Sequence, residues 1–289
     1  ITPGNKHLVE NDGKLATTRD GKAAVEVLHS LLHENDHQAA HNRQHFDQHQ
    51  TLAINLMSSP GSGKTTLLEH TIEKLGKELN IAVIEGDLET ENDANRIREK
   101  GAPAVQITTG SACHLDAHMV HDGLHQLDLD GVDILFIENV GNLVCPASFD
   151  LGHHQNITLL SSTEGDDKPA KYPVMFRAAD LMLITKADLL EVLDDFDTDK
   201  ATDNFRQLAK DNPVITLSSK KDDGMNEWID WLKDTLSDYR KNLAAGQTKH
   251  PAIQPEGANL HSHDHGHSHS HHHSHTHDHT HSHTHSHES

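Results

Sequence analysis

Residues 58–66 read Ser58-Ser59-Pro60-Gly61-Ser62-Gly63-Lys64-Thr65-Thr66, between an apolar run at 52–57 and a helical pattern at 67–75. A strand, a glycine-rich turn and a helix in this order are the context of a phosphate-binding loop, because the turn directs successive backbone N–H groups at an anion. The following helix adds its unpaired N–H groups and the positive end of its dipole. The loop therefore predicts a nucleoside triphosphate site, and a chance match in a Gly/Ser-rich turn is the minor alternative.

The residues of this loop have separate expected tasks. Gly61 and Gly63 allow the tight curl of the backbone. Lys64 is expected to reach the terminal phosphates as a catalytic group, and the Thr65 hydroxyl to ligate Mg²⁺. The general pattern has glycine at the position of Ser58, a departure at the outer edge of the loop. The loop residues expected to contact the nucleotide are Gly61, Ser62, Gly63, Lys64, Thr65 and Thr66.

The composition narrows the classes of protein that this chain can belong to. Its 289 residues carry 24 Lys and Arg against 45 Asp and Glu, a net charge of −21 with histidine neutral. So acidic a chain is a poor candidate for nucleic-acid binding, which depends on Lys and Arg contacts to phosphates. No run approaches the roughly 18 apolar residues of a membrane span, and no hydrophobic secretory segment opens the chain. With only two cysteines there is no disulfide framework, so we expect a protein of the reducing cytosol.

Short aliphatic runs alternate with helical patterns from residue 52 onward. The runs expected to form strands are 52–57, 81–84, 104–107, 133–137, 157–160, 181–184 and 214–217. The helical patterns are 23–49, 67–75, 89–100, 114–127, 199–210 and 225–240. Near-continuous aliphatic strands separated by helices predict an α/β P-loop fold, with a mostly parallel central sheet flanked by helices. Ligands of such sheets bind beyond the carboxyl ends of the strands.

Composition also divides the chain into three parts. Residues 1–50 are a polar segment and a helix, residues 51–244 form the nucleotide-binding domain, and residues 245–289 are a linker and a histidine-rich tail. In the N-terminal helix a histidine recurs at every fourth position, at His29, His33, His37, His41, His45 and His49. Neighbouring pairs of these side chains meet and could clamp a metal ion. A solvated helix surface explains any single pair slightly better.

Acidic residues follow two of the expected strands. Asp87, in Glu85-Gly86-Asp87, can hold Mg²⁺ or orient the attacking water, and we expect it to be a functional residue. For Asp93 a functional role and a structural role, such as capping a helix, are equally expected. Glu138 and Gly141 occupy the places of the acidic residue and the γ-phosphate-sensing glycine of a GTPase switch. That pattern is usually Asp-x-x-Gly, so direct metal ligation by Glu138 is open although we expect it to be catalytic.

Two later strand ends point to a guanine base. Thr185-Lys186-Ala187-Asp188 resembles the GTPase motif Asn-Lys-x-Asp, in which the carboxylate accepts guanine N1–H and N2–H₂ and the lysine stem covers the ring. Ser218 and Ser219 resemble the loop behind the base. Each match is weak alone, but in this order, each at a strand end, they favour GTP over ATP.

Cys113-His114 and Cys145 form a candidate metal site. Thiolate and imidazole together suit a borderline divalent ion such as Ni²⁺ or Zn²⁺. Three ligands leave a site incomplete, and two copies of the chain across a twofold axis would supply six. An isolated cysteine is often only a small buried hydrophobe, but the proximity of Cys145 to the switch motif favours ligation.

Further histidines extend the candidate metal chemistry. His118, His121 and His125 share one face of a helix with His114, and we expect this stripe to receive or relay metal. A hydrophilic exposed face is about as good an explanation. The tail residues expected to bind nickel loosely are His261, His263, His265, His267, His269, His271, His272, His273, His275, His277, His279, His281, His283, His285 and His287. Their composition predicts a disordered metal buffer, and a pH-responsive charged tail is the minority alternative.

Together these residues resemble the HypB family of hydrogenase nickel-incorporation GTPases. The resemblance covers about residues 35–231 and depends most on the block 137–150. The other matching stretches are 57–66, 85–87, 113–117, 136–150 and 163–169. Three features depart from the family pattern. Thr185 replaces the usual asparagine, and the cysteine-rich nickel motif that some members carry near the N-terminus does not appear in this sequence. The histidine-rich stretch, which usually precedes the GTPase domain, is here mostly C-terminal.

The resemblance implies slow GTP hydrolysis coupled to delivery of Ni²⁺ into the large-subunit precursor of NiFe-hydrogenase. It also implies a small zinc-containing nickel chaperone, HypA, as partner, and a nucleotide-dependent homodimer with Cys113, His114 and Cys145 at its interface. Nickel or zinc at the cysteines remains open. The alternatives to this reading are a related GTPase that serves urease and a protein that mainly stores nickel.

Overall fold

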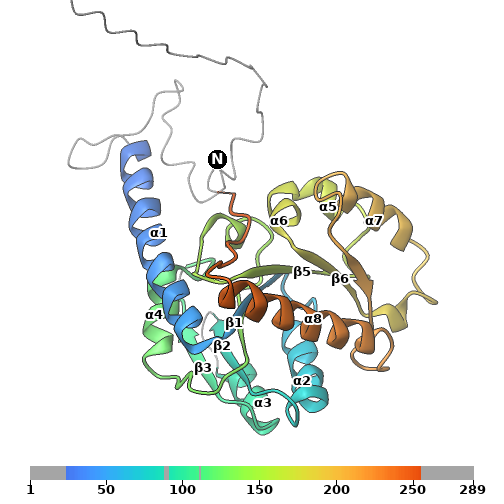
Figure 1. The fold of residues 1–289 in the computed structure, drawn as a ribbon. Helices are drawn as coiled ribbons and strands as arrows, with labels where there is room; N and C mark the ends of the chain where they lie inside the picture. The colour runs from blue at the N-terminus through green and yellow to red at the C-terminus, as the bar shows by residue number, and fades with distance from the viewer. Residues whose placement is uncertain (1–23, 88–90, 111, 255–289) are drawn as a thin grey trace, which may run out of the picture.

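The fold is built on one seven-stranded sheet, described by a computed structural model over residues 24–87, 91–110 and 112–254 (Figure 1). The strands are β1 (Leu52–Ser58), β2 (Ile81–Asp87), β3 (Ala104–Thr108), β4 (Ile134–Glu138), β5 (Gln155–Ser161), β6 (Leu181–Thr185) and β7 (Val214–Thr216). Neighbouring strands are all parallel, in the order β3-β2-β4-β1-β5-β6-β7. This order places β1, which leads into the phosphate-binding loop, between β4 and β5.

Helices cover both faces of the sheet. One face carries α2 (Lys64–Leu75), α3 (Asn92–Glu99) and α8 (Met225–Ala244). On the other face, α1 (Ala24–His49) and α4 (Ala117–Leu124) cover the half containing β1 to β4, whereas α6 (Pro173–Ala178) and α7 (Thr198–Arg206) cover the other half. The short elements are α5 (Lys168–Lys171), η2 (Pro146–Ser148) and η3 (Ala187–Leu189). The result is a three-layer α/β/α sandwich.

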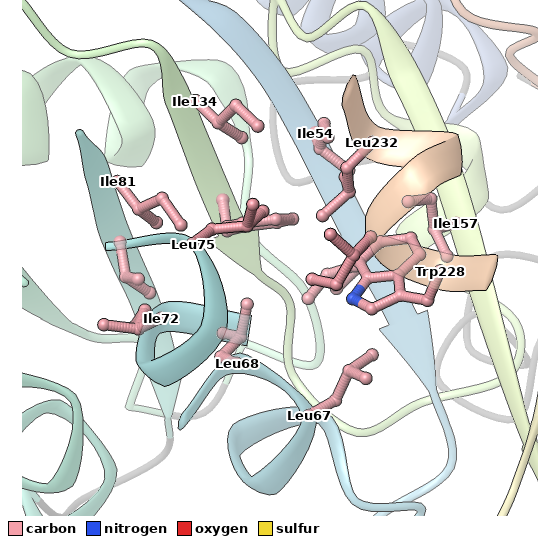
Figure 2. Close-up of a cluster of buried hydrophobic side chains, with 14 of the residues drawn as sticks. Ile54, Leu67, Leu68, Ile72, Leu75, Ile81, Ile134, Ile157, Trp228 and Leu232 are labelled. Carbon is pink, nitrogen blue, oxygen red and sulfur yellow. The ribbon is translucent and has the colours of Figure 1, made fainter. Parts of the chain in front are cut away.

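Alternation along the strands explains how one sheet serves two cores. In β1, Ile54 points to the face that holds α2 and α8, whereas Ala53 belongs to the core under α1 and α4. Figure 2 shows Ile54 in one cluster of buried side chains with Leu67 of α2 and Trp228 of α8. Fully burying a leucine or isoleucine side chain contributes about 1.5–3 kcal/mol, so these aliphatic cores carry the fold without many aromatic residues.

The sequence prediction of the fold class is confirmed, because every predicted strand run overlaps a strand of this parallel sheet. The predicted helix over 114–127 is shorter than expected. It begins at Ala117, where the Asp116 side chain accepts a hydrogen bond from the backbone N–H of Met119 and caps the helix. The expectation that His114 lies on this helix was therefore wrong. Helices α5 and α6 were not predicted because they are too short to show a period.

Helix α1 packs on the core through Phe46, and polar contacts bind it to α4 and to the segment before β5. The Asn42 amide donates to the backbone oxygens of Ala117 and Leu151, and the Arg43 guanidinium pairs with Asp150 at 2.7 Å. Asn42 and Arg43 are both buried, so α1 is held in a fixed position beside α4. Figure 1 shows the two helices side by side.

The chain returns to the sheet after α8 in a segment that we call the C-terminal strap, residues 246–254. Lys249 pairs with Asp180 at 2.9 Å, and the Asn156 amide donates to the backbone oxygen of Ala252. The backbone N–H of Gln254, the last described residue, donates to the oxygen of Ala147. Within the described part of the chain, no helix combines the length and apolarity needed to cross a membrane.

Candidate functional site

The phosphate-binding loop has the backbone geometry that its glycines permit. Gly61 and Gly63 have φ values of 74° and 95°, in the left-handed region that side-chain-bearing residues rarely adopt. Gly63 is the residue before α2, and the helix starts at Lys64, so the unpaired N–H groups of its first turn face the loop. The loop therefore presents a helix N-terminus and a curled backbone, the arrangement that binds phosphate.

Lys64 lies buried between the loop and the end of β4. Its ammonium donates to the Ser58 hydroxyl at 3.0 Å and stands 3.9 Å from a Glu138 carboxylate oxygen. The Thr65 hydroxyl donates to the same Glu138 oxygen at 3.0 Å. Ser58, the residue at which the loop departs from the general pattern, is thus the partner of the lysine. The structure brings the predicted residues Lys64, Thr65 and Glu138 together.

A second carboxyl group accompanies Glu138. Glu85 on β2 is its register partner on β4, and both side chains are buried. Burial, followed by repulsion from Glu138, raises the pKa of Glu85 to about 12, and burial also raises the pKa of Glu138. Among the described residues, neither Glu85 Oε2 nor Glu138 Oε2 has a hydrogen-bond partner. A divalent cation would satisfy these oxygens, so the residues fit a Mg²⁺ ion here.

Asp87 ends β2, two residues beyond Glu85. Its backbone oxygen accepts hydrogen bonds from both the N–H and the hydroxyl of Thr109. Asp93, the more ambiguous acid, pairs with Arg96 at 2.8 Å, and Arg96 also contacts Glu69 of α2. Asp93 therefore helps to fasten α3 to the helix that follows the phosphate-binding loop.

Glu164 is a site residue that the sequence analysis did not single out. Its carboxylate accepts hydrogen bonds from the hydroxyls of Ser59 and Ser62 and from the backbone N–H of Ser161, and so braces the loop from the end of β5. Its position in the stretch 163–169 was the only sequence signal. Thr185, which replaces the usual asparagine of the guanine motif, donates its hydroxyl to the backbone oxygen of Ser62 at 2.7 Å.

The predicted base-binding loops meet beyond β6 and β7. The Ser218 hydroxyl donates to the Asp188 carboxylate at 2.6 Å, and the backbone N–H of Ala187 donates to the oxygen of Leu217. Lys186 has a φ of 58°, a left-handed conformation that turns the chain sharply at this point. Ser219 follows directly. Since Thr185 also donates to the phosphate-binding loop, a direct hydrogen bond joins the two halves of the predicted nucleotide site.

Gly141 lies against the phosphate-binding loop. A Cβ atom at this position would come within 2.7 Å of the Pro60 backbone, so only glycine fits. Gly86 is similarly close to a side chain, since its Cβ would lie 2.7 Å from Leu115. The two glycines mark the points where the switch segment and the segment after Cys113 touch the nucleotide loops.

The predicted metal residues Cys113, His114 and Cys145 converge at the surface. The two sulfur atoms are 3.2 Å apart, the Cys113 sulfur is 3.4 Å from His114 Nδ1, and both thiols are free. Their ligand atoms all lie within 4.8 Å of one another, and no other such cluster occurs in the part of the chain that the structure describes. Burial lowers the pKa of His114, and burial next to Cys113 raises the pKa of Cys145 to about 11.

Asparagine side chains hold the metal residues against the switch segment. The Asn142 amide donates to the backbone oxygen of Cys113 at 3.1 Å. Asn139, directly after Glu138, accepts a hydrogen bond from the backbone N–H of Leu115 at 3.1 Å, and its amide donates to Asn55 on β1. Asn139 is buried and was not singled out from the sequence, although it lies in the block 137–150. It links the cysteine cluster to the nucleotide loops.

The predicted stripe on α4 consists of His118, His121 and His125, because the His114 ring instead stacks on Phe149 at 3.9 Å. The stripe faces α1: the rings of His121 and His41 are 5.3 Å apart. Burial and the nearby histidines lower the pKa values of His45 and His121. The predicted tail histidines lie outside the described residues.

Comparisons with known proteins agree on one family. The nucleotide-binding domain family CobW/HypB/UreG matches residues 52–216. Hydrogenase maturation factor HypB of Azotobacter chroococcum mcd 1 is 54% identical over 210 residues, which are 72% of this chain and 68% of that protein. The hydrogenase/urease maturation factor HypB of Helicobacter pylori is 43% identical over 73% of this chain and 88% of that protein. The crystal structure of Helicobacter pylori HypB in complex with nickel superposes with a TM-score of 0.69 at 42% identity, covering 75% of this chain and 99% of that one.

Proposed function

Because this chain belongs to the HypB hydrogenase maturation factors of the CobW/HypB/UreG nucleotide-binding family, we propose that it hydrolyses GTP to drive the delivery of Ni²⁺ during hydrogenase maturation. The nickel-bound structure of the Helicobacter pylori relative supports nickel as the cargo. The parts of the proposal are the nucleotide reaction, the cargo site and the coupling between them.

In the proposed reaction, Lys64 and the N–H groups of the loop hold the phosphates of GTP. Thr65 and Asp87 would hold Mg²⁺ near the unpartnered oxygens of Glu85 and Glu138, and the ion would neutralise the charge of the β- and γ-phosphates. Glu138, next to Lys64 and Thr65, acts catalytically by positioning the attacking water. Asp188 accepts the guanine N–H groups, and the loop from Ser218 supports the base. The hydrogen bond of Thr185 to Ser62 supports a role for this departure in joining the base and phosphate loops.

The proposed cargo site consists of Cys113, His114 and Cys145. Two thiolates and an imidazole suit Ni²⁺ and also Zn²⁺. Because the cluster is partly exposed and supplies only three ligands, we propose that a second copy of the chain faces it in a nucleotide-dependent homodimer. Displacement of the ion from its thiolates would release it to the large-subunit precursor, with HypA as the partner chaperone.

The main support for coupling between the nucleotide site and the cysteine cluster is the position of Asn139. This one side chain follows the Glu138 of the nucleotide site and bonds the backbone N–H of Leu115, the neighbour of His114. A shift of the switch segment when the γ-phosphate is lost would therefore move the cysteine cluster. Metal affinity and nucleotide state are then linked, and each must change the other by the same factor.

We further propose that the chain works in three parts: residues 1–50, 51–244 and 245–289. The last part stores or buffers nickel through its histidines. The strap supports this arrangement, because the backbone N–H of Gln254, the last described residue, donates to the oxygen of Ala147, two residues after Cys145. A tethered store raises the local concentration of its ion without any new contact.

The coupling is tested on the full chain by titrating Ni²⁺ in the presence of GDP or of a non-hydrolysable GTP analogue. The readout is the thiolate-to-nickel charge-transfer absorption, to which tail histidines do not contribute. We expect the two nickel affinities to differ by about 5- to 150-fold, the usual range of coupling between sites. In Asn139→Ala we expect the ratio to fall below about 2-fold, whereas Asn142→Ala lowers both affinities and keeps the ratio, since coupling depends on the contact to Leu115. Equal nickel affinities with GDP and with the GTP analogue in the unaltered protein would contradict the proposed coupling.

The name of the Helicobacter pylori relative favours urease maturation as a second candidate role. A strain that contains both enzymes and lacks this protein separates the two. We expect loss of hydrogenase activity that excess nickel restores. Loss of urease activity alone would instead assign the chain to urease.

A further inference from the structure

Helices α1 and α4 bring together histidines that are far apart in the sequence. We call the following set the interhelical histidine cluster: His41, His45, His49, His121 and His125. Across the helices, the rings of His41 and His121 are 5.3 Å apart. Along the helices, the rings of His45 and His49 are 4.7 Å apart, and those of His121 and His125 are 4.6 Å apart. None of these histidines belongs to the cysteine cluster.

We propose that this cluster is a second transition-metal site, which binds a borderline divalent cation such as Ni²⁺ or Zn²⁺ through imidazole nitrogens of both helices. Imidazole is a preferred ligand of these ions. With metal–nitrogen bonds of about 2.1 Å, two ligands of one ion lie about 3 Å apart. Ring centres 4.6–5.3 Å apart reach this spacing by turning about their side-chain bonds. His41 and His125 are exposed, so nothing packed around them prevents the turn.

The backbone of the site is fixed before any ion arrives. The buried Asn42, one residue after His41, donates to the backbone oxygen of Ala117, the first residue of α4. The spacing of the two helices is therefore set by a direct bond between them, and only side chains have to move. A site on such rigid elements avoids much of the entropic cost of assembling its ligands.

One histidine already has the outer partner that metal ligands commonly have. His49 Nδ1 lies 3.0 Å from a carboxylate oxygen of Asp130. A carboxylate at Nδ1 holds the proton there and leaves the Nε2 lone pair for a metal. A merely hydrophilic helix surface has no need of histidines that meet across two helices, and this distinguishes the two explanations. The inference does not depend on the proposed delivery of nickel.

The test uses thermal unfolding of the full chain, followed by circular dichroism with and without Ni²⁺, in a Cys113→Ser, Cys145→Ser background. We compare the background with His41→Gln plus His121→Gln, which removes one ligand from each helix. The matched control is His33→Gln plus His37→Gln, an exposed pair on α1 outside the cluster. All three proteins carry the same tail, so its contribution cancels.

At a nickel concentration about 100-fold above the dissociation constant, we expect Tm to rise by about 5 °C in the background and in the control, and by less than about 1 °C in the cluster variant. The single changes His41→Gln and His121→Gln should each remove most of the rise, because one ion needs both helices. Equal rises in all three proteins, no rise in the background, or a rise that His41→Gln removes but His121→Gln leaves intact would overturn the interhelical site. Equal Tm values without metal exclude misfolding of the variant, and an unequal value is resolved by repeating the comparison with His45→Gln plus His125→Gln.

Discussion

The nucleotide loops and the cysteine cluster are built in opposite ways. The key polar side chains of the phosphate-binding loop are buried and already bind one another, Lys64 to Ser58 and Thr65 to Glu138. The cysteine cluster lies on two loops, is partly exposed, and has only three ligand atoms together. A complete and buried site can recognise its ligand within one chain, whereas an open and incomplete one can gain and lose an ion as its surroundings change. The difference suits the proposed function, in which the nucleotide drives the delivery of a metal ion that the cysteine cluster binds and releases.

The largest expected effect comes from removing Lys64 from the phosphate-binding loop. In Lys64→Ala we expect kcat for GTP hydrolysis to fall by at least about 100-fold, as losses of charge-stabilising donors do. Steady-state phosphate release measures it. Lys74→Ala, on the same helix but paired with Asp222 at the surface, should stay within about 2-fold. A Lys64→Ala protein that hydrolyses GTP normally would contradict the assignment of the loop.

A comparable but separate loss is expected at the open site. In Cys113→Ser plus Cys145→Ser, the nickel affinity of the cysteine cluster should fall by more than about 100-fold, since loss of outer-shell partners alone costs 10–100-fold. The thiolate-to-nickel charge-transfer absorption should vanish, and it should persist in Lys64→Ala. If the same absorption remained after both cysteines were replaced, the ion would lie elsewhere. The pair of variants therefore shows whether the two regions can be disabled independently.

The smallest expected effect concerns a chain of buried polar groups that begins at Asn139, the residue that links the two regions. Asn139 bonds Asn55, Asn55 bonds Asn156, and His153 shares the same Asn156 oxygen at 2.7 Å. Burial lowers the pKa of His153 from 6.5 to about 4. The unfolded chain therefore binds more protons than the folded chain between these values, so His153 makes stability fall as pH drops through this window.

We expect this histidine to account for about 2–3 kcal/mol of the stability lost between pH 7 and pH 4. Urea unfolding at several pH values measures it. His153→Gln should be less stable at pH 7 but show a flatter pH dependence, whereas His70→Gln, at a half-exposed position on α2, should follow the original curve. Parallel curves for all three proteins would mean that His153 is not kept neutral in the core.

Most of the fold could be predicted because its signals are local. Aliphatic runs such as 133–137 report a strand that is buried on both faces, whatever lies next to it. The nine residues 58–66 indicate both the start of a helix and a phosphate-binding loop. Local signals failed where a helix start depends on a cap: Asp116 begins α4, and this removed His114 from the predicted stripe.

The site could be predicted only in part, because several of its contacts join residues that no motif links. Glu85 meets Glu138 because β2 and β4 are neighbours in the sheet, and Glu164 braces the loop because β5 lies beside β1. Asn139 could not be recognised as a contact of Leu115 until the end of β4 was placed against the segment after β3. Strand order decides all three contacts.

The sequence by itself determined the class of fold, the phosphate-binding loop and the types of side chain at 113, 114 and 145, since each depends on residues adjacent in the chain or on composition. Only the tertiary structure decided which of these groups face one another. It paired the two sulfur atoms, joined the switch segment to the cysteine cluster, and turned the histidines of α1 toward those of α4. The physical reason is that side chains interact over a few ångströms, and only the packing of the sheet and helices brings distant residues within that range.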